Sequence, residues 1–366
     1  MARRLDVEKV APTTTPSATE TKRVTIRDVA ALAGVDASLV SRVLNDHPKA
    51  SAGPATRHRI LEAARELGYH PNVAARSLRT AKTWTLGLLL PNLTNPMYAA
   101  IARAAERRAQ MRGYGLVFAI HVEGEDEATF ARMLQQGRVE GLLTASSVLT
   151  DAFLRRIAIG AIGPVVMLNR RVPGIRASVT VDDAAGAALA THHLASLGHK
   201  QVAGIFGPGR IDTTSRRRAG FVKAQKQAGI KATMVEGIGL DPAAGAAAAD
   251  HIFRIHPEVT GIFASTFAIA TGVLRAARLA GFGIPDDLSL VALHDSELAD
   301  YFNPPLTTVR MPVDEMADRA VDLLLDLIDG AAPRSVVVRT PPVLIARGST
   351  AAPRKIKRLS SRTRAA

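Results

Sequence analysis

Residues 28–45, DVAALAGVDASLVSRVLN, contain two short helix-forming runs that are interrupted at Gly34 and resume at Asp36. Glycine ends helices readily, and aspartate is a favoured N-cap for the helix that follows. The second run keeps its apolar side chains at helical spacing on one face, and these are Leu39, Val40, Val43 and Leu44. The opposite face is polar, so it is free to lie against something outside the protein.

The flanking sequence supplies the remaining helix boundaries. Thr25 can cap a first helix, Pro54 suits the first position of a third helix, and Gly68 can end it. Two helices joined by a tight turn and supported by a third form the arrangement that places the second helix in the DNA major groove. The polar face of that helix would present Ser38, Ser41, Arg42 and Asn45, beside the small Ala37.

The formal net charge of +14 is concentrated at the two ends of the chain. Residues 1–83 hold 14 Lys and Arg against 8 Asp and Glu, and residues 351–366 hold 6 against none. The 267 residues between them are nearly neutral, with 27 against 25. This distribution suits an anionic polymer better than a small acidic substrate, although a basic tail can also serve only for solubility.

The composition excludes several classes of protein. No apolar run is long enough to span a membrane, and the N-terminus lacks the pattern of a secretory signal. The chain has no cysteine, which excludes disulfides and thiolate metal sites. We therefore expect a cytoplasmic protein with no membrane partner, and no motif implies a cofactor or a metal.

From Thr85 onward, apolar runs of strand length alternate with amphipathic stretches. The pattern predicts about ten strands, with helices over residues 97–112, 126–136, 150–160, 184–197, 215–228, 242–255 and 268–280. Such alternation implies right-handed βαβ units, parallel sheets and, at this length, two doubly wound subdomains. Ligands bind such folds at the carboxyl ends of the strands, so a cleft between the subdomains is the expected site.

Several motifs in this order resemble the LacI family of bacterial transcription regulators. VTIRDVAALAGVDASLVSRVLN (24–45) and LEAARELGYHPNVAARSLRT (61–80) resemble its headpiece and hinge. The match continues to about residue 347 through GLLLPNLTNP, HLASLGHKQVAGIFGP, RRAGF, GFGIPDDLSLVALHD and PPLTTVRMP. The resemblance implies an α/β protein, in which a three-helix helix-turn-helix headpiece and a hinge helix precede a doubly wound domain like the periplasmic binding proteins, with two subdomains.

The predicted parts of the chain follow from the motifs and the resemblance together. They are a disordered extension (1–23), a headpiece (24–70), a hinge helix and linker (71–83), an effector-binding and dimerisation domain (84–350) and a basic disordered tail (351–366). The chain is expected to pass between the subdomains near residues 182 and 306.

The resemblance assigns roles to residues of the headpiece and hinge. Ala37, Ser38 and Arg42 would contact bases, whereas Ser41, Asn45 and Asn72 would contact the DNA backbone. Residues 73–79 would form a hinge helix that pairs with its copy in a second subunit. The rest of the predicted DNA-binding set is Thr25, Ala75, Leu78 and Arg79. Leu78 would wedge into a minor-groove base step, although the alternative is a linker leucine packed on its own domain.

The resemblance also implies an effector pocket, lined by Asn95, Met97, Tyr98, Asn169 and Arg217. Arg217 is the strongest candidate because a guanidinium can clamp vicinal hydroxyls or a carboxylate. Its neighbours Arg216 and Arg218 are interpreted as solvated helix residues.

The chain departs from the family's pattern at three pocket positions. Many members carry Asn-Asp after the strand that is GIFA here, and Gly-aromatic-Asp-Asp after a later strand. This chain has Thr266, Phe267 and His294 instead. Less polar positions and an imidazole predict an effector that differs from a neutral hexose, such as an anionic or less hydroxylated compound near His294 and Arg217.

Two departures fall in the headpiece. The loop at residues 46–55 is about two residues longer than is usual in the family, and Asp36 replaces the usual serine. The loop could shift contacts with phosphates, and the aspartate keeps an N-cap while adding negative charge near DNA.

Two other classes of function were weighed. An enzyme is disfavoured because GIFGPG lacks the spacing of a dinucleotide-binding motif, and His192, His193 and His199 are placed for surface or capping roles. A transport binding protein is disfavoured by the headpiece and the missing signal peptide. The sequence thus predicts a homodimeric transcription regulator, expected to be a repressor, that binds a near-palindromic operator and a small-molecule effector such as a sugar or related metabolite. The tail has no leucine heptad, so no tetramer is expected.

Overall fold

A computed structural model describes residues 24–44, 51–69, 82–120, 138–145, 150–159, 163–237 and 239–353. The chain divides into two compact units, residues 1–81 and residues 82–366. The predicted helix at 126–136 and the predicted hinge helix at 73–79 lie outside the described residues.

The smaller unit contains the three predicted helices, α1 (Ile26–Ala33), α2 (Ala37–Leu44) and α3 (Pro54–Glu66). The Asp28 carboxylate accepts hydrogen bonds from both Thr25 N and Thr25 Oγ1 at 2.7 Å, which fixes the start of α1. Gly34 ends α1 with a left-handed φ of 65°, and Asp36 Oδ1 accepts from Ser38 N at 2.7 Å to begin α2. Beneath these turns lies one core, made of Val29, Ala30, Ala33, Val40, Val43, Ile60, Ala63 and Ala64.

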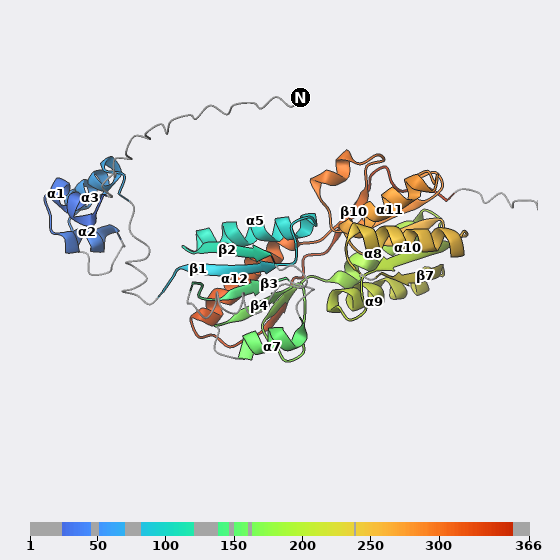
Figure 1. Cartoon of the computed structure of the whole chain (residues 1–366), viewed down its shortest axis with the longest axis horizontal. Coiled ribbons are helices and arrows are strands. Elements are labelled where there is room, and N and C mark those ends of the chain that lie inside the picture. The colour runs from blue at the N-terminus through green and yellow to red at the C-terminus, as the bar shows by residue number, and fades with distance from the viewer. Residues whose placement is uncertain are drawn as a thin grey trace, which may run out of the picture. The chain divides into compact units, whose positions relative to one another are not determined.

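The larger unit contains two six-stranded sheets (Figure 1). The first sheet has the order β11-β5-β4-β3-β1-β2 and is parallel throughout. Its strands are β1 (Thr85–Leu90), β2 (Gly115–Ile120), β3 (Leu142–Thr144), β4 (Val165–Leu168), β5 (Ser178–Thr180) and β11 (Ser335–Val337).

The second sheet has the order β12-β10-β9-β8-β6-β7, and only β12 runs antiparallel, against β10. Its strands are β6 (Gln201–Phe206), β7 (Lys231–Glu236), β8 (Gly261–Ala264), β9 (Ser289–Leu293), β10 (Thr307–Arg310) and β12 (Val343–Ile345). The fold class is therefore as predicted. The described residues hold twelve strands, and β10 to β12 lie beyond the stretch whose strand-and-helix alternation carried the prediction.

The chain passes between the two sheets three times. The first passage lies between β5 and α8 (Asp183–Ser196), at the residue expected. The second was expected near residue 306, but β10 belongs to the second sheet, so the passage follows Arg310. A third passage, which was not predicted, joins β11 of the first sheet to β12 of the second.

Helices cover the sheets in layers. On the second sheet, α8 packs with α9 (Asp212–Gln227), and α10 (Pro242–Ile255) packs with α11 (Phe267–Leu279). Alternate residues of β6 enter two different cores, because Val202 and Phe206 pack with α8, whereas Ala203 and Ile205 pack with α10 and α11. The two helix pairs therefore cover opposite faces. On the first sheet lie α5 (Pro96–Met111), α7 (Asp151–Ile159) and α12 (Val313–Ile328).

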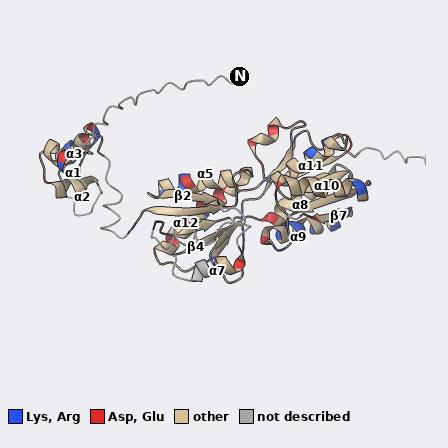
Figure 2. Cartoon of the chain, in the orientation of Figure 1, with Lys and Arg blue, Asp and Glu red and all other residues tan. Residues whose placement is uncertain are grey.

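Ion pairs join α5 to α12 along the first sheet. Arg108 and Arg112 both bind Asp322, at 2.7 and 2.6 Å, and Arg107 binds Asp318 at 3.2 Å. Figure 2 shows basic and acidic residues interspersed along α5. These two helices, which are more than 200 positions apart in sequence, thus form one layer.

Gly220 of α9 explains how closely α8 and α9 pack. A Cβ atom at this position would collide with the backbone carbonyl of Ala184. Only glycine allows this approach, which brings the first turn of α8 against α9. Helix α9 begins at Asp212, three residues before the predicted start at Ser215. Asp212 is the acidic residue of its first turn.

The beginning of the predicted tail is ordered. Ser289 Oγ donates to Ala351 O and accepts from Ala351 N, both at 3.0 Å. His199, which was placed on the surface or at a cap, is 1% exposed, and its ring nitrogens contact Thr260 Oγ1 at 2.8 Å and Ala351 O at 3.0 Å. His193 likewise contacts Thr350 Oγ1 at 2.9 Å. The ordered domain therefore reaches at least residue 353.

Candidate functional site

The first candidate surface lies on α2 of the headpiece. Ser38 is exposed, and Ala37, Ser41 and Arg42 are half-buried. Arg42 lies along the helix, where its Nη2 donates to Ser38 Oγ at 3.2 Å and its Nε to Ser38 O at 3.3 Å. Apolar Val40 and Val43 are buried on the opposite face, so the polar side chains of α2 point away from the core.

Part of the predicted DNA-binding set cannot be placed. Thr25 is exposed at the N-terminus of α1. Asn45, Asn72, Ala75, Leu78 and Arg79 lie outside the described residues.

The second candidate site lies in the larger unit, whose described residues form two clefts. The site is the cleft between the two sheets, and we name it the first cleft. It is lined by Asn95, Met97, Tyr98, Ala145, Leu168, Asn169, Arg170, Ile211, Thr213, Arg217, Leu240 and Thr266. Six of the predicted effector residues are in this set. The free volume is about 30 Å³, room for little more than a water molecule or two, so the described conformation is closed.

The N-termini of three helices meet at this cleft. Asn95 caps α5 by accepting from Met97 N at 3.1 Å, and Thr266 caps α11 by accepting from Ile269 N at 3.0 Å. Thr213 lies in the first turn of α9. Helix N-termini favour negative charge because their first backbone N–H groups have no partner within the helix.

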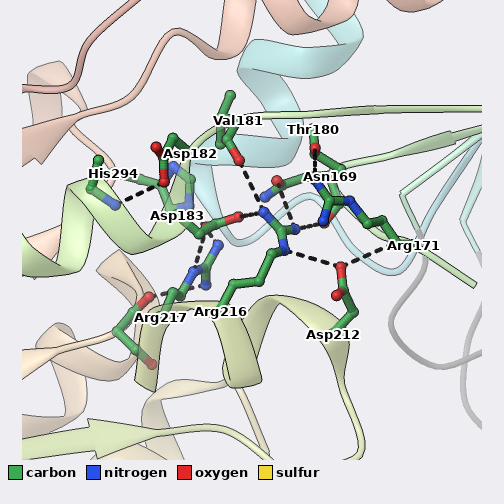
Figure 3. Close-up of polar contacts among 12 residues, drawn as sticks. Asn169, Arg171, Thr180, Val181, Asp182, Asp183, Asp212, Arg216, Arg217 and His294 are labelled. Carbon is green, nitrogen blue, oxygen red and sulfur yellow. Dashed lines mark hydrogen bonds and ion pairs between the residues drawn. The ribbon is translucent and has the colours of Figure 1, made fainter. Parts of the chain in front are cut away.

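Arg217 lies at the back of the first cleft and is 3% exposed (Figure 3). Its Nε donates to Asp183 Oδ1 at 2.7 Å, and its Nη1 donates to Ser265 O at 3.0 Å. Its Nη2 lies 3.0 Å from His294 Nε2. Three contacts from three different elements therefore fix the plane of the guanidinium.

Arg216 is not a solvated helix residue, contrary to prediction. Its side chain is 16% exposed, and it donates to Val181 O at 2.9 Å and to Asn169 O at 3.1 Å. It also pairs with Asp183 at 2.5 Å and with Asp212 at 3.1 Å. Helical spacing could not show this, because Val181, Asn169 and Asp183 lie outside α9. Arg218 is about half exposed and pairs with Glu236 at 2.8 Å, which agrees better with the prediction.

His294 is 2% exposed and adopts a left-handed φ of 70°. A guanidinium can only donate, so His294 Nε2 accepts from Arg217 and the neutral ring carries its proton on Nδ1. Burial, and then the charge of Arg217, hold the pKa of His294 well below its usual value. Among the described residues, Nδ1 has no hydrogen-bond partner.

The neighbouring Asp295 holds this loop in place. It accepts from Thr308 Oγ1 at 2.6 Å, from Arg310 Nη2 at 2.7 Å and from Arg347 Nη1 at 2.9 Å. These contacts tie the segment after β9 to β10 and to the segment after β12, so the position of His294 depends on both.

A larger second cleft of about 670 Å³ lies on the other side of His294. It is bounded by the exposed face of α5, the segment after β9 and the second passage, and Met97 lines both clefts. Its charged residues have both signs, and they are Arg103, Arg310, Asp295, Glu297 and Asp314.

Comparison with known proteins places these two surfaces in one family. Residues 25–72 match the model of bacterial regulatory proteins of the lacI family, and residues 191–350 match that of a periplasmic binding protein-like domain. The regulator RegA of Clostridium saccharobutylicum is 33% identical over 309 residues, which cover 83% of this chain and 92% of that protein. The regulator MalR of Streptomyces coelicolor is 36% identical over 343 residues, which cover 89% and 96%.

The chain belongs to the LacI family. Its relatives are regulators of transcription and not enzymes, and it is a DNA-binding regulator of that kind.

Solved structures of the LacI family share its fold. The lac repressor dimer bound to operator and the anti-inducer ONPF is 29% identical, with a TM-score of 0.75, and the match covers 90% of this chain and all of that one. The complex of the regulator CelR with cellobiose is 29% identical, with a TM-score of 0.67 and 89% of this chain covered. Within the described residues, no helix is both long and apolar enough to cross a membrane.

Two of the three positions at which the chain departs from the LacI family pattern have different surroundings from those expected. Phe267 is 3% exposed and packs on Phe302, with ring centroids 5.7 Å apart, and it lines neither cleft. His294 lines the second cleft and reaches the first only through Arg217. Thr266 alone lines the first cleft directly.

Sequence reasoning missed four polar or charged residues at this LacI-family cleft, and also the apolar residues Ala145, Leu168, Ile211 and Leu240. Arg170 and Thr213 line it, whereas Asp183 and Arg216 organise Arg217 from behind. The sequence holds one weak indication of the role of Asp183, because an acidic pair, Asp182 and Asp183, comes soon after β5. Asp182 caps α8 through Ala185 N at 2.9 Å, which leaves Asp183 for the arginines.

Proposed function

We propose that the protein is a homodimeric repressor that binds a near-palindromic operator and is released or retained by a small molecule in the first cleft. The observation that carries the proposal is the joining, in one LacI-family chain, of a headpiece whose second helix has a polar face to a closed cleft between two sheets. Relatives are known as repressors, and the lac repressor structure holds a dimer on its operator.

The DNA-binding role falls on α2. Ser38 and Arg42 already form a bonded pair one turn apart, and each can exchange that bond for a base edge when α2 enters the major groove. Ala37 would pack against a thymine methyl group. The unplaced residues Asn45, Asn72, Ala75, Leu78 and Arg79 keep their predicted roles in this proposal.

The effector would act by changing the relation of the two subdomains. Bonds from Arg216 to Asn169 O and Val181 O cross between them, so opening the first cleft must break these bonds. An effector that binds one arrangement better shifts the population toward it. The coupling is reciprocal, so an effector that weakens operator binding must bind the operator complex less tightly by the same factor.

The proposal is tested by selecting duplexes from a randomised DNA library with the full-length protein and sequencing those that bind. We expect enrichment of a near-palindrome whose half-sites lie about one helical turn apart. Arg42→Ala should relax the preference at one position of each half-site. Arg65→Ala is the control, because that side chain is 85% exposed on α3. Selection that enriches no sequence, or an Arg42→Ala protein with an unaltered preference, would overturn the assignment.

A further inference from the structure

The charges that line the first cleft are all positive. Among the described residues, its lining includes two charged side chains, Arg170 and Arg217, and no carboxylate. The second cleft, by contrast, is lined by both signs. Lining by arginine alone among the charged residues is therefore particular to the first cleft, and the second cleft does not share it.

Carboxylates are present nearby, but arginines hold them away from the cleft. Asp183 is fully buried and is shared by Arg216 and Arg217, at 2.5 and 2.7 Å. Asp212 accepts from Arg216 Nε at 3.1 Å and from Arg171 N at 3.0 Å. Asp183 and Asp212 together balance the charges of Arg216 and Arg217, and neither carboxylate lines the first cleft.

The side chains that face a ligand are rich in donors. A guanidinium carries five N–H bonds, and Arg217 uses three of them in its contacts with Asp183, Ser265 and His294. The two N–H bonds that remain on Arg217 can be donated to a ligand in the first cleft.

Two of the side-chain acceptors that line the first cleft are already engaged. Asn95 Oδ1 accepts from Met97 N, and Thr266 Oγ1 accepts from Ile269 N. A neutral polyol must donate a hydrogen bond from each hydroxyl that it buries, and a missing acceptor costs about 1–3 kcal/mol. A carboxylate or a phosphate only accepts, which matches the N–H donors of Arg217 and the three helix N-termini.

We infer that the effector is an anion whose carboxylate or phosphate group binds Arg217 at the junction of the three helix N-termini. The inference rests on the proposed function, since it names the chemical class of the effector that controls the regulator. The apolar residues Met97, Leu168, Ile211 and Leu240 would then contact the remainder of the molecule. Arg170, which also lines the cleft and pairs with Asp151, would provide a second guanidinium.

The test uses inorganic phosphate and acetate as separate probes of the two anion types. The thermal midpoint of the full-length protein is followed as each probe replaces chloride at constant ionic strength. We expect a saturable rise with at least one probe. Arg217→Gln should weaken the apparent affinity about tenfold or more, as expected for the loss of a charge-assisted bond. Arg218→Gln should retain the wild-type response, and this control also accounts for anions bound elsewhere, including on the headpiece.

Arg217→Gln also removes a partner of the buried Asp183, which destabilises the fold. Arg170→Gln is therefore a second variant, since its carboxylate partner Asp151 is 41% exposed and can be solvated. This variant should reduce the response by a smaller factor than Arg217→Gln. A response to phosphate alone would indicate a phosphate ester, and a response to acetate alone would indicate a carboxylate. No response to either probe, or equal responses in Arg217→Gln, Arg170→Gln and Arg218→Gln, would refute the inference.

A second arm compares neutral sugars with their acids in calorimetry, using glucose with glucuronate and galactose with galacturonate. Tighter binding of either acid supports the inference, and tight binding of a neutral sugar overturns it. DNA selection is scored separately. A protein that enriches an operator but binds a neutral sugar keeps the proposed function and loses only its anionic effector.

Discussion

The headpiece and the first cleft present their polar side chains in opposite ways. On α2, Ser38 and Arg42 lie outside a small apolar core, and their bonds are local, to each other and from Ser38 to Asp36. In the cleft, Arg217 and His294 are almost completely buried and are held by residues from distant parts of the chain. The DNA-binding surface therefore depends on local helix geometry, whereas the effector site depends on how two subdomains meet.

The largest effect is expected from a substitution in the core of the headpiece, which should abolish DNA binding and leave the larger unit folded. Val40→Asp would bury an unpaired charge at a fully buried position, which costs several kcal/mol and should unfold a unit whose core is made of eight buried residues. We expect complete loss of DNA binding, while the thermal midpoint of the larger unit stays unchanged. Leu32→Asp is the control, because Leu32 is 48% exposed. A large fall in the midpoint of the larger unit would show that the two units are not energetically separate.

The next largest effect is expected in the cleft. Asp183→Asn removes the carboxylate that compensates two arginines, and breaking a buried ion pair costs about 3–5 kcal/mol. Urea unfolding of the larger unit should report this loss. Asp182→Asn is the matched control, since Asp182 is exposed and asparagine also caps a helix. Equal effects of the two substitutions would remove Asp183 from the centre of the site.

A smaller effect should appear at the contact between subdomains. Arg216→Leu removes the donors that reach Val181 O and Asn169 O, and should lower the opening free energy by about 1–3 kcal/mol. Hydrogen exchange should become faster over residues 165–183 and 209–216 and stay unchanged in the headpiece. Arg218→Leu, one position along the helix, should change neither region. Unaltered exchange in Arg216→Leu would mean that other contacts keep the cleft closed.

The smallest effect concerns pH. The pKa of His294 is lowered in the folded protein, mainly by burial, so the folded state holds this ring neutral while the unfolded chain protonates it near pH 6.5. The contribution to stability is complete above pH 6.5 and is lost as the pH falls below it, by at most about 1.4 kcal/mol per pH unit. His294→Asn should flatten that slope in the larger unit, and exposed His192→Asn serves as the control. A slope unchanged by His294→Asn would assign it to other groups.

Most of the fold could be predicted because local sequence patterns specify it. Gly34 and Asp36 set the headpiece turn, and the alternation of strands and helices indicated two parallel sheets. The third passage and β10 to β12 were missed because they lie beyond the stretch whose alternation of strands and helices carried the prediction.

The candidate site was predictable in part for the same reason. Six of the eight predicted residues line the first cleft, but the pattern could not show that Phe267 is core or that Arg216 bridges the subdomains. Those facts depend on partners 35 or more positions away in sequence.

The three passages also bear on how this protein can change by recombination. The headpiece can be exchanged for that of a relative with one junction, near residue 82, where the two units divide. A subdomain cannot be exchanged in this way, because each subdomain is built from separate chain segments. Between these segments the chain runs through the other subdomain. A new operator preference can thus be acquired in a single crossover, whereas the effector cleft must be inherited whole or altered one residue at a time.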